Sequence, residues 1–564
     1  MSAADFSSLC ALHRATTARL GPLPALRFKR DRLWQHLTWD EYRQAADDAA
    51  AGLVAVGLKA GDRVALLAEN RCEWLVADHA ILSAGAVDVP IHAPASPAQV
   101  RYQLAHSGAR GIVVSDTAQL QKVAAVLEGL PELRFVVGFD PVDPLPPGWG
   151  GRTLSWAGLC QAGRRAGLQG RQAVAQREAD LGPDSLATII YTSGTTGEPK
   201  GVMLSHGNLL SNSAAAQDVF QFGCAEVMLS WLPYSHVFAR CVDHYATTRM
   251  GTTLALAESP LTLLENLREI QPMGFTSVPR PLEKVWAQLR ALPAPARAAA
   301  ARDLLGARLD YLCSGGAPLP VPVAAGLREA GVPVFEGYGL TETSPIIAVN
   351  RRDRWKVGTV GPPIAGIEVQ IAPDGELLTR GPHVMRGYWH DPAATAAVLH
   401  DGWLRTGDLG ALDGDGFLSI TGRKKDLIIT ASGKNIAPAL LEGLLVADPF
   451  IEQAVVYGDA RPFVAAIIAP RPDRLAAAAQ EAGTSLPTAE GVVRDPRLSA
   501  WFQRRVDDLM AAVSPPERVK RILLLSRPFS AEQGEVTVTH KVRRGVIVRR
   551  YHAELDALYH GHAR

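Results

Sequence analysis

The chain carries the stretch Tyr191-Thr-Ser-Gly-Thr-Thr-Gly-Glu-Pro-Lys-Gly-Val202 between two short apolar segments. The segments 186–190 and 201–205 are rich in β-branched and aliphatic residues, so the pattern predicts two strands joined by a loop. Glycines in such a loop let backbone N–H groups turn inward, hydroxyls add donors, and a lysine adds a positive charge. These are the properties of a polyphosphate-binding loop. Its candidate ligands are Thr192, Ser193, Gly194, Thr195, Thr196, Gly197 and Lys200.

This loop is not a Walker A loop. Pro199 stands where the pattern G-x-x-x-x-G-K-[ST] requires its second glycine, and no helix is predicted directly after the loop. Taken by itself, a Gly-Thr-Thr-Gly stretch is also compatible with a Ser- and Thr-rich surface turn before a basic residue.

The bulk composition is that of an ordinary globular protein. The chain has 564 residues, which suggests three or four structural units, with 47% apolar and 20% charged residues. A formal net charge of +1 provides no field that would recruit nucleic acid, so we expect no nucleic-acid partner. Six scattered cysteines without a C-x-x-C pair argue against a disulfide framework and a structural zinc site, and suit a reducing cytosol. With no signal peptide and no apolar window of about 18 residues, we expect a cytoplasmic enzyme, free or peripheral on the inner face of the membrane.

The first half of the chain alternates between predicted helices and strands. A capping box at 38–41 predicts a helix to about Val56, and a strand (63–67), a helix (73–82) and a strand (111–115) follow. Such alternation is typical of layered α/β domains with largely parallel sheets. We therefore predict two layered α/β subdomains, with a surface loop at 140–151 and a helical insertion at 291–301.

The pattern changes in the second half. Short strands with Gly and Pro turns from about 358 to 421 predict a small β-barrel or sandwich. The sequence Asp413-Gly-Asp-Gly416 resembles a calcium loop but lacks the other ligands of one, so we predict a hairpin turn there. Helices and strands alternate again after 422, which is enough chain for a small α+β domain. The expected domains are residues 1–422 and 423–564.

Two further strings carry candidate binding residues. In Ser314-Gly-Gly-Ala-Pro318, Gly315 and Gly316 allow a flat ring to approach the backbone, although an ordinary β–loop–α turn would have the same composition. In the string 335–345, Tyr338 lies between two glycines and suits stacking on a purine, while Thr341 and Glu342 offer the hard oxygen ligands that Mg²⁺ takes beside phosphates. The alternative for this string is a buried core tyrosine followed by a helix cap.

Together these strings resemble the motifs of the adenylate-forming enzymes, the superfamily of acyl-CoA synthetases, luciferases and peptide-synthetase adenylation domains. The resemblance continues at Thr406-Gly-Asp408, at 422–428 and at 534–544, and spans about residues 37 to 559. The latter two are basic stretches that, without the family, suggest solvated surface. No G-x-S-x-G elbow occurs at Ser193 or Ser314, so a serine hydrolase is not supported.

The resemblance implies a role for each matching residue. Gly315, Gly316, Ala317 and Tyr338 would line the adenine site, and Thr341 would contact the α-phosphate. Glu342 and Thr195 would hold Mg²⁺. Asp408 would bind both ribose hydroxyls, which also suits a carboxylate because it can accept twice. Arg423 would reach the ribose or phosphate, Lys425 would be the hinge, and Lys541 would bridge the attacking carboxylate and the α-phosphate. One departure from the family pattern is His540, where relatives commonly carry an apolar residue.

Several segments resemble one branch of the superfamily, the long-chain fatty acyl-CoA synthetases. The stretch 231–238 would open the acyl pocket, with His236 as a substrate-binding residue, and it lacks the aspartate expected in an amino-acid-activating domain. The segments 278–285 and 432–438 resemble this branch specifically, and 381–389 is shared more widely. Gly433 would face the pantetheine tunnel.

The implied activity is a two-step ligation. ATP would activate a medium- to long-chain fatty acid as its acyl-adenylate, and CoA would take the acyl group, giving acyl-CoA, AMP and pyrophosphate with Mg²⁺ as the metal. Three alternatives stay open: a fatty acyl-AMP ligase that loads an acyl carrier protein, a ligase for an aryl or branched acid, and a non-catalytic acyl or nucleotide sensor. The residues that argue against a sensor are Lys200, Glu342, Asp408, Arg423 and Lys541.

Overall fold

A computed structural model describes residues 6–142, 153–192, 198–431, 434–486, 491–511, 513–530, 532–536 and 542–560. The predicted loop at 140–151 lies almost entirely outside these ranges. The predicted hairpin is present: β8 (Leu186–Thr192) and β9 (Lys200–Ser205) pair antiparallel, with Thr192 opposite Lys200.

This hairpin belongs to an eight-stranded sheet whose central strands are parallel. Its order is β18-β9-β8-β4-β3-β5-β6-β7, and only the pairs of β9 with β8 and β18 are antiparallel. The remaining strands of this sheet are β3 (Arg63–Ala68), β4 (Val87–His92), β5 (Gly111–Val114), β6 (Phe135–Gly138), β7 (Thr153–Ser155) and β18 (Gly387–Tyr388).

A second eight-stranded sheet has the order β15-β14-β13-β12-β10-β11-β1-β2. It is also parallel in its interior, as expected for strands whose connections cross over through helices. Its strands are β1 (Pro24–Arg30), β2 (Leu33–Thr38), β10 (Val227–Ser230), β11 (Thr253–Leu256), β12 (Gly274–Ser277), β13 (Tyr311–Ser314), β14 (Val334–Gly339) and β15 (Ile346–Val349). The prediction of two layered α/β subdomains is therefore confirmed.

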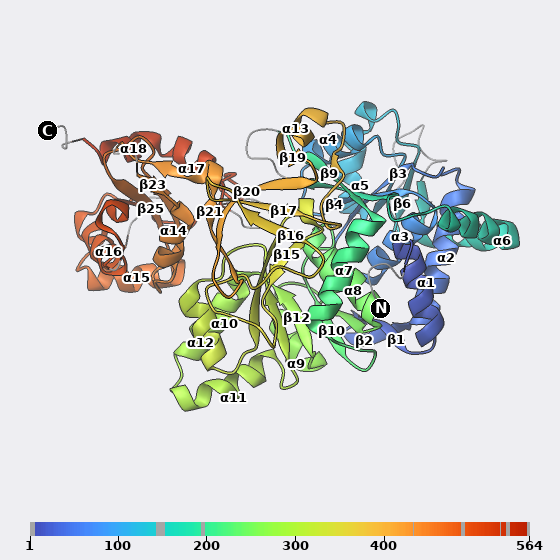
Figure 1. Ribbon diagram of the computed structural model, residues 1–564, viewed down its shortest axis with the longest axis horizontal. Helices are drawn as coiled ribbons and strands as arrows, with labels where there is room; N and C mark the ends of the chain where they lie inside the picture. The colour runs from blue at the N-terminus through green and yellow to red at the C-terminus, as the bar shows by residue number, and fades with distance from the viewer. Residues whose placement is uncertain are drawn as a thin grey trace.

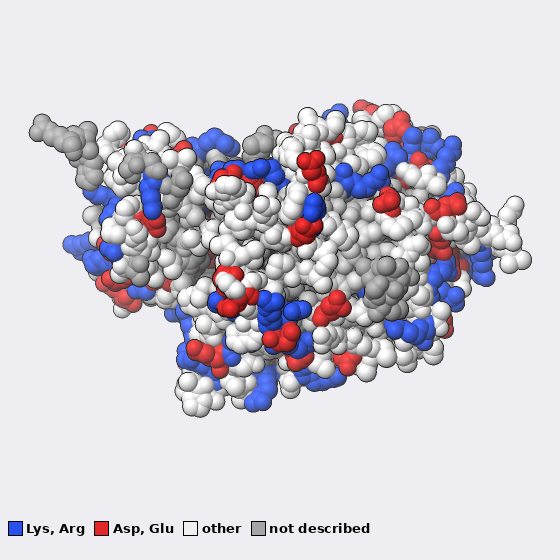
Figure 2. Space-filling view, in the orientation of Figure 1, with Lys and Arg blue, Asp and Glu red and all other residues white. Residues whose placement is uncertain are grey.

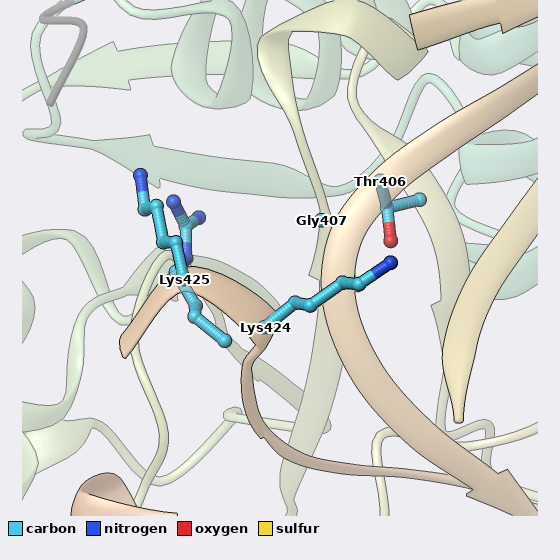
Figure 3. A pocket seen from close by; sticks show the side chains of 5 residues that line it. Thr406, Gly407, Lys424 and Lys425 are labelled. Carbon is cyan, nitrogen blue, oxygen red and sulfur yellow. The ribbon is translucent and has the colours of Figure 1, made fainter. Parts of the chain in front are cut away.

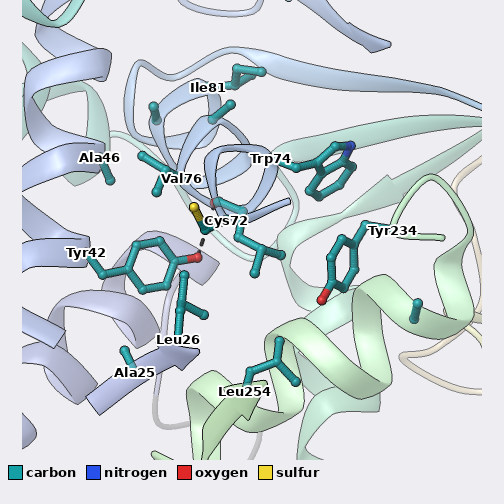
Figure 4. Close-up of a cluster of buried hydrophobic side chains, with 14 of the residues drawn as sticks. Ala25, Leu26, Tyr42, Ala46, Cys72, Trp74, Val76, Ile81, Tyr234 and Leu254 are labelled. Atoms are coloured by element: carbon teal, nitrogen blue, oxygen red, sulfur yellow. Dashed lines mark hydrogen bonds between the residues drawn. The ribbon is translucent and has the colours of Figure 1, made fainter. Parts of the chain in front are cut away.

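Helices join the two sheets into one large unit (Figure 1). The capping box is present, because Thr38 Oγ1 accepts from the Glu41 backbone N–H and the Glu41 carboxylate accepts from the Thr38 N–H. In Figure 4 the side chains of Tyr42, Trp74 and Tyr234 point into one buried cluster that residues of both sheets share. The helices of this unit are α1 (Leu9–Leu20), α2 (Trp39–Ala55), α3 (Cys72–Ser83), α4 (Pro97–Ser107), α5 (Thr117–Ala124), α6 (Trp156–Ala179), α7 (His206–Phe220), α8 (Ala246–Met250), α9 (Leu263–Ile270), α10 (Pro279–Arg290), α11 (Ala294–Leu305), α12 (Val321–Glu329) and α13 (Pro392–Val398). The predicted helical insertion corresponds to α11.

The β-rich region forms one antiparallel five-stranded sheet of β16 (Glu368–Ile371), β17 (Glu376–Arg380), β19 (Leu399–His400), β20 (Trp403–Leu412) and β21 (Leu418–Arg423). The predicted barrel is not closed among the described residues. Its longest strand, β20, pairs with β17 between Leu404 and Leu409, with β19 at Trp403 and Leu404, and with β21 from Asp408 to Leu412. The β20–β21 pairing has an irregularity at Leu409/Gly410. The predicted hairpin turn at 413–416 is confirmed, with the Gly416 N–H donating to the Asp413 carbonyl at 3.0 Å.

The last part of the chain forms a separate small α+β unit with its own core, drawn in orange and red in Figure 1. The five-stranded sheet lies between this small unit and the large one in that view. A three-stranded sheet, β24-β25-β26, is its centre. Its elements are β22 (Ile428–Ile429), β23 (Asn435–Ile436), α14 (Pro438–Val446), β24 (Ile451–Tyr457), β25 (Val464–Pro470), α15 (Pro472–Glu481), α16 (Pro496–Leu509), β26 (Val519–Leu524), α17 (Arg544–Arg550) and α18 (His552–Ala557).

Charges of both signs are interspersed over the face seen in Figure 2, in keeping with the net charge of +1. Within the described ranges, none of the helices combines the length and the apolar character needed to cross a bilayer.

Candidate active site

Three of the predicted nucleotide-binding residues meet where the large unit joins the five-stranded sheet. Asp408 on β20 and Arg423 at the end of β21 are cross-strand partners, and their Oδ1 and Nε atoms lie 2.9 Å apart. The Tyr338 hydroxyl on β14 donates to Asp408 Oδ2 at 2.6 Å. Asp408 is only 2% exposed, and this burial raises the pKa of its carboxyl, while Arg423 and the Tyr338 hydroxyl act in the opposite direction. The structure thus brings together an aromatic face, a buried double acceptor and a cation.

A cavity of about 270 Å³ lies beside this cluster and is lined by Thr406, Gly407, Arg423, Lys424 and Lys425. In Figure 3 the side chains of Lys424 and Lys425 point away from each other. The Lys424 ammonium lies 2.7 Å from Asp374 and 3.0 Å from Glu376, so it is held toward β17. Burial, and then the neighbouring Arg423, lowers the pKa of Lys425. A cavity with this concentration of basic side chains suits an anionic ligand.

The glycine loop after β13 lies next to β14, which carries Tyr338. These two strands are parallel neighbours, and ligands of open α/β sheets bind outside the carboxyl ends of such strands. A Cβ atom on Gly315 would lie only 3.1 Å from the Phe238 ring, which leaves little room for a side chain, and Gly316 has a φ of +77°, which favours glycine. Ala317 is exposed beside them. The loop therefore presents a bare backbone near the tyrosine, as an adenine site requires.

Two of the predicted phosphate and metal residues, Lys200 and Glu342, both contact Tyr388. Glu342, which follows Thr341 in a short 3₁₀ turn (Thr341–Thr343), accepts a hydrogen bond from the Tyr388 hydroxyl at 2.9 Å. The Lys200 ammonium lies 4.9 Å from the centroid of the same ring. We did not assign Tyr388 a role from the sequence, although it lies in the string 381–389 that resembles the family.

His236 is exposed in the segment after β10, and its ring centroid is 5.2 Å from that of His92. His92 Nδ1 in turn lies 3.0 Å from Ser235 Oγ. Burial lowers the pKa of His92 and so favours the neutral form of the ring. No sequence motif pointed to His92, because it reaches this place only through the folding of β4.

Directly after this segment, a π-helix (Ala239–Tyr245) carries a fully buried charge cluster. Arg240 pairs with Asp78 on α3 and, at 2.6 Å, with Asp88 on β4. It also donates to Thr188 on β8 at 2.7 Å. The cluster therefore connects the π-helix, which follows β10 of the second sheet, to α3 and to strands β4 and β8 of the first sheet.

Glu336 is a further residue that the sequence analysis left without a role. Its carboxylate accepts a hydrogen bond from the Leu319 N–H, just after the glycine loop, and burial raises its pKa to about 7. It thus supports the loop that lies beside Tyr338.

Several predicted residues lie outside the described ranges, and their roles stay predictions. They are Ser193, Gly194, Thr195, Thr196, Gly197, Gly433 and Lys541. Thr192, at the end of β8, is described and is half-buried opposite Lys200.

Comparison with known proteins places this chain in a family. A model described as "AMP-binding enzyme" matches residues 14–389, and one described as "AMP-binding enzyme C-terminal domain" matches residues 425–563. The long-chain-fatty-acid–CoA ligase FadD15 of Mycobacterium bovis is 36% identical, covering 94% of this chain and 93% of the relative. The peroxisomal long chain acyl-CoA synthetase 6 of Arabidopsis thaliana is 30% identical, covering 91% of this chain and 80% of the relative.

Solved structures share the fold at lower identity. The anthranilate CoA ligase AuaEII in complex with anthranoyl-AMP superposes with a TM-score of 0.80 at 21% identity, covering 99% of this chain and all of that one. ATP-bound MatB from Rhodopseudomonas palustris gives 0.72 at 24% identity, covering 96% of this chain and 99% of that one. With both family models and full-length relatives in agreement, this chain belongs to the AMP-binding enzyme family.

Proposed function

We propose that this protein is an AMP-forming ligase that activates a medium- to long-chain fatty acid with ATP and transfers it to CoA. The observation that carries the proposal is the cluster of Tyr338, Asp408 and Arg423 beside a basic cavity. Such a cluster offers a ring for the base, two carboxylate oxygens for a ribose diol and a cation for phosphate. Two relatives, named as a long-chain-fatty-acid–CoA ligase and a long chain acyl-CoA synthetase, are similar over 93% and 80% of their length and support the choice of acid.

In the first step a carboxylate oxygen of the acid attacks the α-phosphorus, and the bond to pyrophosphate breaks. The acid is itself the nucleophile, so the residues need only to position it and to neutralise charge. We assign Lys200 and Lys541 to the phosphates, Thr341 to the α-phosphate and His236 to the acyl side. In the second step the CoA sulfur attacks the acyl carbonyl, AMP leaves, and the thiol proton is lost.

The residues present fit a magnesium ion that is held mainly by the nucleotide. Magnesium usually takes one or two carboxylates together with substrate phosphates and water, and the described residues contain no cluster of three or more protein ligands. Glu342 offers one half-buried carboxylate, and we assign Thr195 as its partner. When bound, the ion would neutralise charge that builds on the phosphates.

We propose a domain boundary at residues 422/423, with Lys425 as the hinge. Residues 424–426 form a short 3₁₀ turn between the last strand of the five-stranded sheet and the first strand of the small unit. Rotation there would withdraw Lys541 after the first step and bring Gly433 to the pantetheine of CoA. We also propose a reducing, cytoplasmic setting, because all six cysteines are free thiols. A peripheral contact with the inner face of the membrane would agree with the choice of substrate.

The test is acid-dependent exchange of pyrophosphate into ATP across C2 to C20 acids, with acyl-CoA measured in parallel. We expect exchange to peak with medium or long chains, and acyl-CoA and AMP to form with free CoA and no protein partner. Accumulation of acyl-adenylate in the presence of CoA would instead support the acyl-AMP ligase that loads an acyl carrier protein. A preference for aryl or branched acids would change the substrate class, and a lack of exchange with every acid would support a sensor.

A further inference from the structure

Tyr388 contacts two residues that the proposed function places at the phosphates of ATP. Its hydroxyl donates to Glu342 Oε1 at 2.9 Å, and its ring lies beneath the Lys200 ammonium, 4.9 Å from ring centroid to Nζ. The tyrosine itself is 8% exposed. The buried Tyr388 side chain therefore contacts both the Glu342 carboxylate and the Lys200 ammonium.

The strand pairing fixes this arrangement. Tyr388 on β18 pairs with Val202 on β9, and Lys200 is two residues along β9, so the lysine and the tyrosine share a face of the sheet as diagonal neighbours. The backbone of the same segment also holds Glu342, because the Met385 N–H donates to the Glu342 carbonyl at 2.9 Å. Glu342 is therefore attached to this segment through both its backbone and its side chain.

Contacts behind Tyr388 keep its backbone in place. The Tyr388 N–H donates to Thr395 Oγ1 at 2.9 Å. The preceding residue, Gly387, has a φ of +136°, and a Cβ there would lie 2.7 Å from Thr395. Only glycine fits at position 387, and this allows β18 to pack closely against α13.

The ring separates two opposite charges that would otherwise neutralise each other. In the described part of the chain, no ion pair joins Lys200 to Glu342, and each group contacts Tyr388 instead. The face of an aromatic ring attracts a cation without neutralising it, and a hydroxyl can satisfy one carboxylate oxygen while leaving the other.

We infer that Tyr388 is a positioning residue that orients the Glu342 carboxylate toward magnesium and keeps the Lys200 ammonium available to phosphate. This role depends on the proposed function, because the latter supplies the assignment of Glu342 to the metal.

The experiment measures the affinity for a non-hydrolysable ATP analogue by calorimetry, once with Mg²⁺ and once with EDTA. The ratio of the two affinities reports the coupling between metal and protein without any turnover. Tyr388→Phe removes only the hydroxyl, so we expect the ratio to fall roughly tenfold, the value of one lost hydrogen bond to a charged group, while the affinity in EDTA stays as in the wild type. Tyr388→Leu also removes the ring, so the affinity in EDTA should fall as well.

Tyr311→Phe is the matched control. Tyr311 is a fully buried tyrosine whose hydroxyl donates to the Asn350 carbonyl at 2.6 Å, away from Glu342 and Lys200, so its loss should leave the ratio unchanged. Thermal unfolding of each variant separates a lost fold from a lost contact. A Tyr388→Phe variant that folds and keeps the wild-type ratio overturns the positioning role.

Glu342→Gln distinguishes this failure from that of the proposed metal site. If Glu342→Gln lowers the ratio and Tyr388→Phe does not, only the role of Tyr388 is wrong. If Glu342→Gln keeps the wild-type ratio, Glu342 does not bind the metal, and the role of Tyr388 is overturned together with that assignment.

Discussion

Replacing Asp408 by asparagine should remove the protein's ability to recognise the ribose of ATP. The carboxylate already accepts from Arg423 Nε at 2.9 Å and from the Tyr338 hydroxyl at 2.6 Å. Each carboxylate oxygen has a second lone pair, so both ribose hydroxyls can still donate to it. An asparagine offers one acceptor oxygen, and its amide group can only donate, so at least one of the two ribose contacts is lost.

The size of the effect follows from the burial of the site. A hydrogen bond to a charged group contributes about 1.5–3 kcal/mol, which corresponds to a roughly 10- to 150-fold weaker interaction with ATP. The fold should survive the change. Arg423 is 48% exposed and can turn to solvent, and the Tyr338 hydroxyl can accept from the new amide instead of donating.

The assay compares ATP with 2′-deoxy-ATP in pyrophosphate exchange. The wild type should prefer ATP, and Asp408→Asn should lose most of that preference as well as affinity. Asp374→Asn is the matched control, because Asp374 is a carboxylate near the same cavity that is 46% exposed and pairs with Lys424. If Asp408→Asn discriminates between the two nucleotides as well as the wild type does, the ribose assignment is wrong.

Three other changes test separate parts of the molecule. Lys541→Ala should abolish pyrophosphate exchange, because the loss of this charge costs the first step about 2.7–4 kcal/mol. The variant should still convert supplied acyl-adenylate to the thioester, and equal damage to both steps would contradict the role of Lys541. Glu336→Gln should remove a pH dependence of the protein's stability. Burial raises the pKa of Glu336 to about 7 in the folded protein, above the unfolded value of 4.5, so the stability that its protonated form contributes below pH 4.5 is lost as the pH rises through 7. Denaturant unfolding should therefore show the variant gaining about 2 kcal/mol on the wild type between pH 5 and 8, and parallel pH profiles would refute this. Arg240→Met should destabilise the protein by about 3–5 kcal/mol, because Asp78 and Asp88 stay buried without their partner. The exposed Arg380→Met, which loses a surface pair with Glu368 and a contact with the Trp403 ring, should lower Tm far less.

Local features of the fold could be predicted because their causes are local. The capping box at Thr38 and the hairpin from β8 to β9 follow from residue types at fixed short spacings, and both are present. The strand pairing within the β-rich region could not be predicted, for a related reason. Short strands and turns show where strands lie, but they do not show which partners a long strand such as β20 takes along its length.

The candidate site could be predicted only in part, because its contacts join residues that are far apart in the sequence. Tyr338 and Asp408 were each named from their own strings, but their hydrogen bond spans 70 residues and no pattern predicts it. The contacts of Tyr388 could not be predicted for the same reason, because they depend on the pairing of β18 with β9. Arg240 had no signal at all, because a lone arginine after an apolar segment indicates surface unless its partners are known.

The position of Asp408 also links nucleotide binding to the proposed hinge. Its partner Arg423 is the last residue of β21, and the small unit begins with β22 only five residues later, at Ile428. Lys424 is held toward the large unit by Asp374 and Glu376, whereas the Lys425 side chain points away from that of Lys424 (Figure 3). A rotation of the small unit that leaves Lys424 attached must therefore turn the chain at Lys425 or beyond. The ribose contacts would then stay in place while the small unit moves, which allows one bound nucleotide to serve both steps.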